Sequence, residues 1–147
     1  MKEKVLVSAC LLGVNCKYEG GNNENKQVLK YLEDKEVIPI CPEIMGGLPT
    51  PRDPSERVGN KVFSNKGIDV TENFKRGAEE TLKLAKKLNV TKAILKARSP
   101  SCGYQKIYDG TFKHQQIDGH GITAELLKDN NFTILTEEEI AKIYNEN

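Results

Sequence analysis

Cys10, Cys41 and Cys102 each stand at or just beyond the end of a short run of strand-forming residues. Thiolates that are brought together hold a metal or an iron–sulfur cluster, or they take part in redox chemistry. A free cysteine is also among the residues that proteins most often bury as a small hydrophobe. Serine, proline or glycine lies close to each of these cysteines, which favours a shared site over simple packing.

Cys16 is the fourth cysteine, and the sequence leaves its role open. Five residues separate it from Cys10, which is not a usual spacing for a zinc knuckle. Four thiolates favour a closed zinc site or a fully ligated cluster, whereas three leave one metal position open. Cys16 is therefore a ligand, an alternative to one of the other three, or a buried structural thiol.

Polar side chains beside the thiols are suited to catalysis. Glu43 lies two residues after Cys41, so both side chains point to the same side of an extended segment. A carboxylate next to a metal can act as a general base on water. Ser99 and Ser101 precede Cys102, and their hydroxyls are candidates to hydrogen-bond a substrate. The alternatives are surface or capping contacts for the glutamate and turn formation for the serines.

Two further groups are weaker candidates for ligand binding. Arg52, in a loop rich in glycine and proline, either binds an anion or pairs with a neighbouring carboxylate, that of Asp53 or Glu56. Three tyrosines are candidates to stack on a planar ring of a ligand. The ordinary alternative for these side chains is packing in the core or partial exposure. These tyrosines are Tyr18, Tyr104 and Tyr108.

Four short apolar runs predict the strands that must position these residues. They lie at 5–7, 37–40, 93–95 and 132–135. Continuous apolar runs, rather than alternating ones, are typical of parallel strands that are buried on both faces. Pro39 places the second strand towards an edge of the sheet, because proline lacks the N–H that a central strand donates.

Helical periodicity fills the segments between the predicted strands. It appears near residues 24–34, 72–89 and 121–129, and again after Thr136. Thr71 is a suitable N-cap for the longest of these helices. The last helix begins with capping-box spacing and is expected to bury Ile140 and Ile143.

Two segments interrupt the alternation of strands and helices, and each predicts a hairpin. The first, residues 56–71, contains a turn signal at 65–67. The second, residues 106–115, contains Asp109-Gly110, a pair that suits a tight type I′ turn.

The order of elements predicts a single α/β domain over residues 1–147. We expect a small doubly wound, mainly parallel sheet of the Rossmann or flavodoxin-like kind, with about four strands and two hairpin insertions. Ligands of such sheets bind where the carboxyl ends of neighbouring strands meet. If the first three strands are neighbours, the cysteines that follow them converge there.

Charge and composition exclude several classes of protein. The chain has 147 residues, a formal net charge of +1 and no long basic run, so no nucleic-acid partner is expected. No apolar stretch reaches the length of a membrane span. The apolar part before Cys10 is shorter than a secretory signal requires. We therefore expect a cytoplasmic protein whose cysteines are reduced rather than paired.

Three separate motifs, in this order along the chain, resemble the thiouracil desulfidase-like family, which was long catalogued as a domain of unknown function. They comprise residues 8–13 with 16–20, residues 41–43 with 46–52, and residues 99–103. The resemblance covers nearly the whole chain. It is to the short form of the family, without the additional C-terminal domain that some relatives carry.

The resemblance implies an oxygen-sensitive [4Fe-4S] cluster that three cysteines hold, with the fourth iron free to bind sulfur. Carried onto this sequence, the implied ligands are Cys10, Cys41 and Cys102. The family motif also contains a cysteine that matches Cys16, so the choice of three follows the positions at the strand ends more than the resemblance.

The resemblance also implies a reaction and a partner. The partner is a small-molecule thiolated base, such as thiouracil, whose sulfur is replaced by water to give uracil and hydrogen sulfide without net electron transfer. Glu43 is then the acid/base residue, and Ser101 or Ser99 assists it.

Two other functions are compatible with the same residues. One is a non-enzymatic α/β module in which the cysteines hold a structural zinc ion. The other is a thiol or persulfide carrier that contains no metal. The sequence gives no indication of the oligomeric state.

Overall fold

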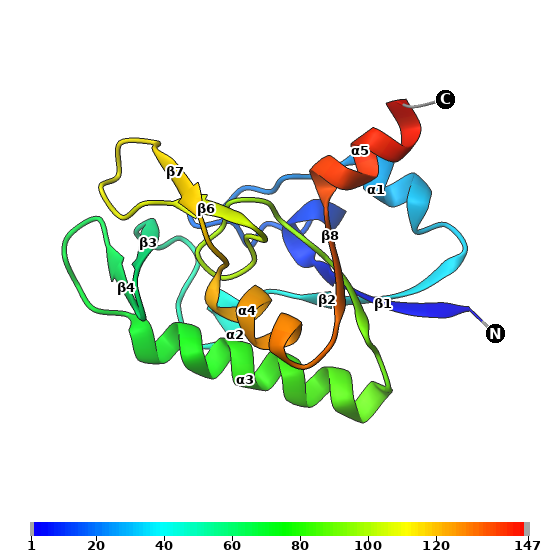
Figure 1. The fold of residues 1–147 in the computed structure, drawn as a ribbon, viewed down its shortest axis with the longest axis horizontal. Coiled ribbons are helices and arrows are strands. Elements are labelled where there is room, and N and C mark those ends of the chain that lie inside the picture. Colours follow the sequence, from blue (N-terminus) through cyan, green and yellow to red (C-terminus); the bar gives the residue numbers. More distant parts are fainter. Residues whose placement is uncertain (1, 146–147) are drawn as a thin grey trace.

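Four parallel strands form the central sheet of the computed structural model, which describes residues 2–145. They are β1 (Glu3–Ser8), β2 (Lys35–Ile40), β5 (Lys92–Leu95) and β8 (Thr133–Thr136), in the spatial order β2-β1-β5-β8 (Figure 1). All three neighbouring pairs are parallel, so the predicted α/β sheet is confirmed. Pro39 lies on the edge strand β2, as its missing N–H requires.

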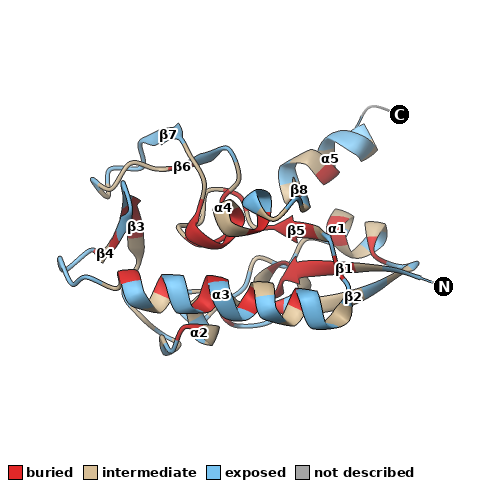
Figure 2. Cartoon of the chain, turned by 60° about the horizontal axis from the view of Figure 1, so that its bottom comes forward, coloured by how far each residue is buried: buried red, intermediate tan, exposed pale blue. Residues whose placement is uncertain are grey.

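Helices cover both faces of the sheet. One face carries α1 (Lys26–Tyr31) and α5 (Glu137–Asn145), and the other carries α3 (Thr71–Leu88) and α4 (Ile122–Asp129) (Figure 1). Side chains alternate along a strand, so Val5 and Val7 of β1 pack on the α1 side and Leu6 packs on the α3 side. Figure 2 shows buried and exposed residues alternating along α3, the pattern of an amphipathic helix. None of the helices in residues 2–145 has the length and apolar character that crossing a membrane requires.

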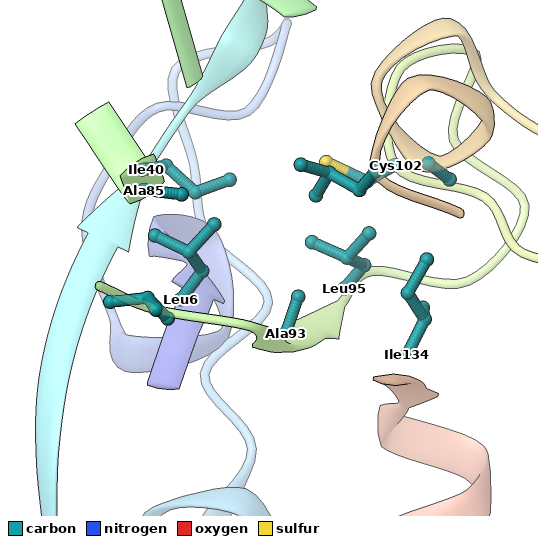
Figure 3. Close-up of a cluster of buried hydrophobic side chains, with 10 residues drawn as sticks. Leu6, Ile40, Ala85, Ala93, Leu95, Cys102 and Ile134 are labelled. Atoms are coloured by element: carbon teal, nitrogen blue, oxygen red, sulfur yellow. The ribbon is translucent and has the colours of Figure 1, made fainter. Parts of the chain in front are cut away.

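The core beneath α3 and α4 continues to the end of the sheet where the cysteines lie. Leu6, Ala93 and Leu95 belong to this core, together with Ile134 of the outer strand. Cys102 packs in the same cluster, as Figure 3 shows. One of the candidate ligands is thus anchored in the hydrophobic core.

A short helix that the sequence did not predict, α2 (Pro42–Met45), packs directly on α3 through two glycines. A Cβ at Gly46 would lie 1.9 Å from a backbone oxygen of α3, and a Cβ at Gly77 would lie 1.9 Å from a backbone oxygen of α2. Backbones this close leave no room for a side chain at either position. The contact fixes α2 on α3, and with it the segment that begins at Cys41.

The first hairpin consists of β3 (Ser55–Val58) and β4 (Lys61–Ser64). Its turn lies at Gly59 and Asn60 and was not predicted, whereas the predicted reversal at 65–67 is confirmed. Gly59 has a φ of 59°, and two-residue hairpin turns need a residue with positive φ. The chain does reverse at 65–67, and a bridge then joins β4 to Asp69.

The second hairpin consists of β6 (Lys106–Tyr108) and β7 (Gln116–Asp118). The prediction of a tight Asp109-Gly110 turn is wrong, because residues 109–115 join the two strands. The backbone N–H groups of Gly110 and Phe112 donate to the carboxylate of Glu56 instead of pairing across a short turn. That carboxylate belongs to β3, so the local sequence could not indicate this loop.

Two details of the helices also differ from prediction. Thr71 is the first residue of α3 rather than its N-cap, and its hydroxyl accepts the backbone N–H of Val62. In α5, Ile140 is buried as expected, but Ile143 is 44% exposed. The end of α5 extends away from the sheet there, as Figure 1 shows.

Replacing Gly77 by alanine is expected to destabilise the protein by about 1–3 kcal/mol, because the new Cβ forces α2 and α3 apart. This expected value is the net effect, after the steric cost has been reduced by the gain of roughly 1 kcal/mol that alanine has over glycine within a helix. Urea unfolding measures the free-energy change. Glu80→Ala, at an exposed position of α3, is the control and should stay within about 0.5 kcal/mol of the parent. A Gly77→Ala protein as stable as the parent would contradict the close packing.

Candidate active site

Three neighbouring strands bring three of the cysteines to one edge of the sheet. The parallel strands β2, β1 and β5 lie side by side, so their carboxyl ends meet. Cys41 follows β2 directly, and Cys102 lies in the loop after β5. Cys10 lies just past β1 in a short 3-10 helix, η1 (Ala9–Leu12), that the sequence did not predict. The convergence needs no local Cys-x-x-Cys motif.

A cavity of about 580 Å³ opens at this edge of the sheet, and all four cysteines line it. Its volume lies in the range of about 300–1,000 Å³ that is usual for small-ligand pockets. The other residues that the sequence singled out as site candidates, Glu43, Ser99 and Ser101, also line this cavity. The fold therefore places the candidate ligands and the candidate catalytic residues around one space.

Cys16 sits between two of the other thiols. Its side chain hydrogen-bonds with those of Cys10 and Cys41. These hydrogen bonds lower the pKa of Cys10 to about 7 and that of Cys41 to about 6, against the opposing effect of burial. The same hydrogen bonds raise the pKa of Cys16 far above its ordinary value. These shifts favour the thiolate, the form that binds metal, at Cys10 and Cys41 and the protonated thiol at Cys16.

Cys102 combines core packing with polar contacts. Burial raises the pKa of its thiol to about 12, and hydrogen bonds with the hydroxyls of Ser8 and Ser101 oppose this effect. Ser101 Oγ lies 3.6 Å from Cys102 Sγ. Hydrogen bonds to a ligating sulfur are one of the means by which proteins tune iron–sulfur clusters. Cys102 therefore makes polar contacts in addition to packing in the hydrophobic core.

Both carboxylate oxygens of Glu43 have partners. Arg52 Nε donates to Oε1 at 3.2 Å, and Ser101 Oγ donates to Oε2 at 3.1 Å. The Glu43 side chain is 16% exposed, so the carboxylate is largely shielded but still borders the cavity. The arrangement orients a potential proton acceptor beside the thiols.

Arg52 is the residue that holds Glu43, and the sequence did not predict this pair. The hypothesis that Arg52 pairs with Asp53 or Glu56 is wrong, because its guanidinium pairs with Glu43. Anion binding by Arg52 stays a prediction. A second nitrogen donates to the backbone oxygen of Cys16 at 2.8 Å. Arg52 thus ties the loop that carries Cys16 to the carboxylate.

Ser99 and Ser101 form a hydrogen-bonded chain that ends at Glu43. Ser99 Oγ accepts the backbone N–H groups of Ser101 at 3.1 Å and of Cys102 at 3.0 Å, as in a serine turn. The two hydroxyl oxygens are 3.0 Å apart. The one hydrogen of the Ser101 hydroxyl goes to Glu43 Oε2 or to Cys102 Sγ, and in either case Ser99 can donate its own hydrogen to Ser101. Ser99 therefore shapes the turn, and Ser101 makes the contact with the carboxylate.

Each lysine or arginine that lines the cavity, among residues 2–145, has a carboxylate partner. The pairs are Lys17 with Glu19, Arg52 with Glu43, Lys96 with Glu137 and Arg98 with Glu138. Among the described residues, the lining therefore holds these four cations and two carboxylates, those of Glu43 and Glu56.

Aromatic side chains form another part of the cavity lining. Tyr18 and Tyr108, two of the predicted stacking candidates, border it. The third candidate, Tyr104, does not border the cavity, and its ring stacks on that of His120, which follows β7. Phe112 and His114 also line the cavity, and the sequence had indicated neither. Both belong to the loop whose conformation depends on a distant carboxylate.

The donor atoms fit an iron–sulfur cluster. All four cysteines are free, and their thiols share one cavity. Within residues 2–145, no group of three or more His, Cys, Asp or Glu side chains surrounds a single metal-ion position. Thiolates that hold a cluster are spaced more widely, because each one binds a different iron.

Known proteins share both the sequence and the fold. The model of the 2-thiouracil desulfurase family matches residues 5–139. The uncharacterized protein YbbK of Bacillus subtilis (strain 168) is 40% identical over 149 residues, which cover 95% of this chain and 99% of that relative. The solved structure of the [4Fe-4S]-dependent thiouracil desulfidase TudS has a TM-score of 0.90 and 39% identity, over 99% of this chain and 97% of that one. This chain therefore belongs to the 2-thiouracil desulfurase family.

Proposed function

We propose that this protein is a [4Fe-4S]-dependent desulfidase that removes sulfur from a thiolated pyrimidine such as 2-thiouracil. The observation that carries the proposal is the shared cavity, in which an oriented carboxylate, that of Glu43, borders converging thiols. Membership of the 2-thiouracil desulfurase family and the likeness to TudS support it.

Cys10, Cys41 and Cys102 are the proposed cluster ligands. They follow three adjacent strands, and the lowered pKa values of Cys10 and Cys41 favour their thiolates. Cys16 is not assigned as a ligand, because it does not follow one of the three adjacent strands. When bound, a cluster with one open iron position supplies a Lewis acid that polarises the carbon–sulfur bond and accepts soft sulfur.

Glu43 is the proposed general base and acid. Its Oε2 takes the proton from water, and the contact of Arg52 Nε with Oε1 orients the carboxylate for this. Ser101 donates to the same Oε2 and keeps the carboxylate turned towards the cavity. Ser99 assists only by giving its hydrogen to Ser101 and by shaping the turn.

The proposed reaction balances without an oxidant or a reductant. Water adds its oxygen at the carbon that carries sulfur, the carbon–sulfur bond breaks, and 2-thiouracil becomes uracil. The two protons of the water leave with the sulfur as hydrogen sulfide, one of them by way of Glu43. The carbon keeps its oxidation state.

Anaerobic purification tests the proposal directly. We expect a brown protein with about four irons and four sulfides per chain, which releases uracil and hydrogen sulfide from 2-thiouracil in equal amounts. A protein with stoichiometric zinc and no desulfidation would instead identify a structural zinc module. Desulfidation by a metal-free protein would identify a persulfide carrier, and either outcome overturns the proposal.

Replacing Glu43 by glutamine is expected to lower kcat by about 10²- to 10⁴-fold, because the amide cannot take the proton from water. Iron and sulfide content should not change, since Glu43 is not a proposed ligand. Glu36→Gln, an exposed change on the strand that leads to Cys41, is the control and should have the parent's kcat. Turnover of Glu43→Gln at the parent's rate would remove Glu43 from the mechanism.

A further inference from the structure

The loop of residues 109–115, between β6 and β7, carries aromatic side chains to the cavity. Phe112 is half-buried and lines the cavity, whereas its neighbours Thr111 and Lys113 are exposed. His114 also lines the cavity, and its ring packs edge-on against Tyr108 with centroids 6.0 Å apart and planes at 83°. The loop thus adds aromatic side chains to the side of the cavity where Tyr108 also lies.

A buried carboxylate holds this loop in place. Glu56 Oε1 accepts two backbone N–H groups of the loop, that of Gly110 at 2.9 Å and that of Phe112 at 3.1 Å. Glu56 is 9% exposed, and a buried carboxylate is stable only where donors satisfy it. The clamp joins β3 to a loop more than fifty positions away.

Two features show that the loop conformation is imposed by its surroundings. Phe112 has a φ of 59°, a region that bulky side chains rarely adopt. Gly110 lies directly against β3, because a Cβ there would come within 2.3 Å of a side-chain carbon of Val58. The Glu56 clamp supplies the hydrogen bonds that offset this strain.

We propose that Phe112 stacks on the pyrimidine ring of the substrate and that Glu56 is the positioning residue that holds Phe112 there. This inference rests on the proposed function and adds the residues that recognise the ring. A pyrimidine presents a flat π face whether or not it carries sulfur, and aromatic side chains bind such faces by stacking. In this arrangement the sulfur of the ligand lies at the thiols, and the face of its ring lies against Phe112.

Uracil is the probe that isolates ring recognition, because it has the ring without the sulfur. Its Kd is measured by calorimetric titration of the anaerobically purified, cluster-loaded protein, alongside iron and sulfide content and the KM and kcat for 2-thiouracil. Phe112→Ala is expected to raise the Kd of uracil and the KM by about tenfold, with kcat and iron content unchanged. Lys113→Ala, next to it but exposed, is the matched control and should have the parent's Kd.

Glu56 is tested by a pair of substitutions and a double variant. Glu56→Gln keeps an oxygen that can accept both N–H groups, so its Kd should stay close to that of the parent. Glu56→Ala frees the loop and should weaken uracil binding about as much as Phe112→Ala does. Adding Phe112→Ala to Glu56→Ala should cause little further loss of uracil binding, because Glu56→Ala acts by displacing Phe112.

Several outcomes would overturn the inference. An unchanged uracil Kd in Phe112→Ala would show that Phe112 does not stack on the ring. A Glu56→Gln protein as weak as Glu56→Ala would show that Glu56 acts on the ligand through its charge rather than through the loop. Failure of the proposed function is distinguished from these, because it would abolish desulfidation in the parent protein while uracil binding and its dependence on Phe112 persist.

Discussion

The site depends on the parallel pairing of β1 with β2 on one side and with β5 on the other. Parallel neighbours end at the same edge of a sheet, so residues that follow them meet although they are remote in sequence. Here that geometry gathers Cys10, Cys41 and Cys102 around one cavity. Hydrophobic layers on both faces hold the three strands in register, and Cys102 is itself part of one layer. The same hydrophobic packing therefore stabilises the core and positions the thiols.

Two further contacts convert converging thiols into an oriented site. The backbone contact between α2 and α3 fixes the segment that follows Cys41. The ion pair of Arg52 with Glu43 sets the carboxylate, and Arg52 also binds the backbone oxygen of Cys16. Because these contacts share residues, the thiols, the carboxylate and the serine turn form one connected unit. The proposed chemistry at the carbon–sulfur bond depends on this relative placement of the carboxylate and the thiols.

The sequence was informative where the signal was local or periodic. Continuous apolar runs identified the four strands, and Pro39 correctly indicated an edge strand. Prediction from the sequence failed where a polar group that is distant in the chain determines the backbone conformation. Asp109-Gly110 favours a tight turn, yet Glu56 on another hairpin captures the N–H groups and opens the loop. The pairing of Arg52 was equally hidden, because several carboxylates lie within its reach and only the fold selects Glu43. The roles of the cysteines stay predictions, since packing and ligation both bury thiols.

Mössbauer spectroscopy of the anaerobically purified protein, with and without 2-thiouracil, tests the central claim that three of the four thiols hold a cluster with one open iron. The account predicts that 2-thiouracil changes the signal of about one iron in four. It also predicts the same response in a Cys16→Ser variant, because the proposed ligands are Cys10, Cys41 and Cys102. A signal that does not respond to 2-thiouracil, or loss of the cluster in Cys16→Ser, would contradict it.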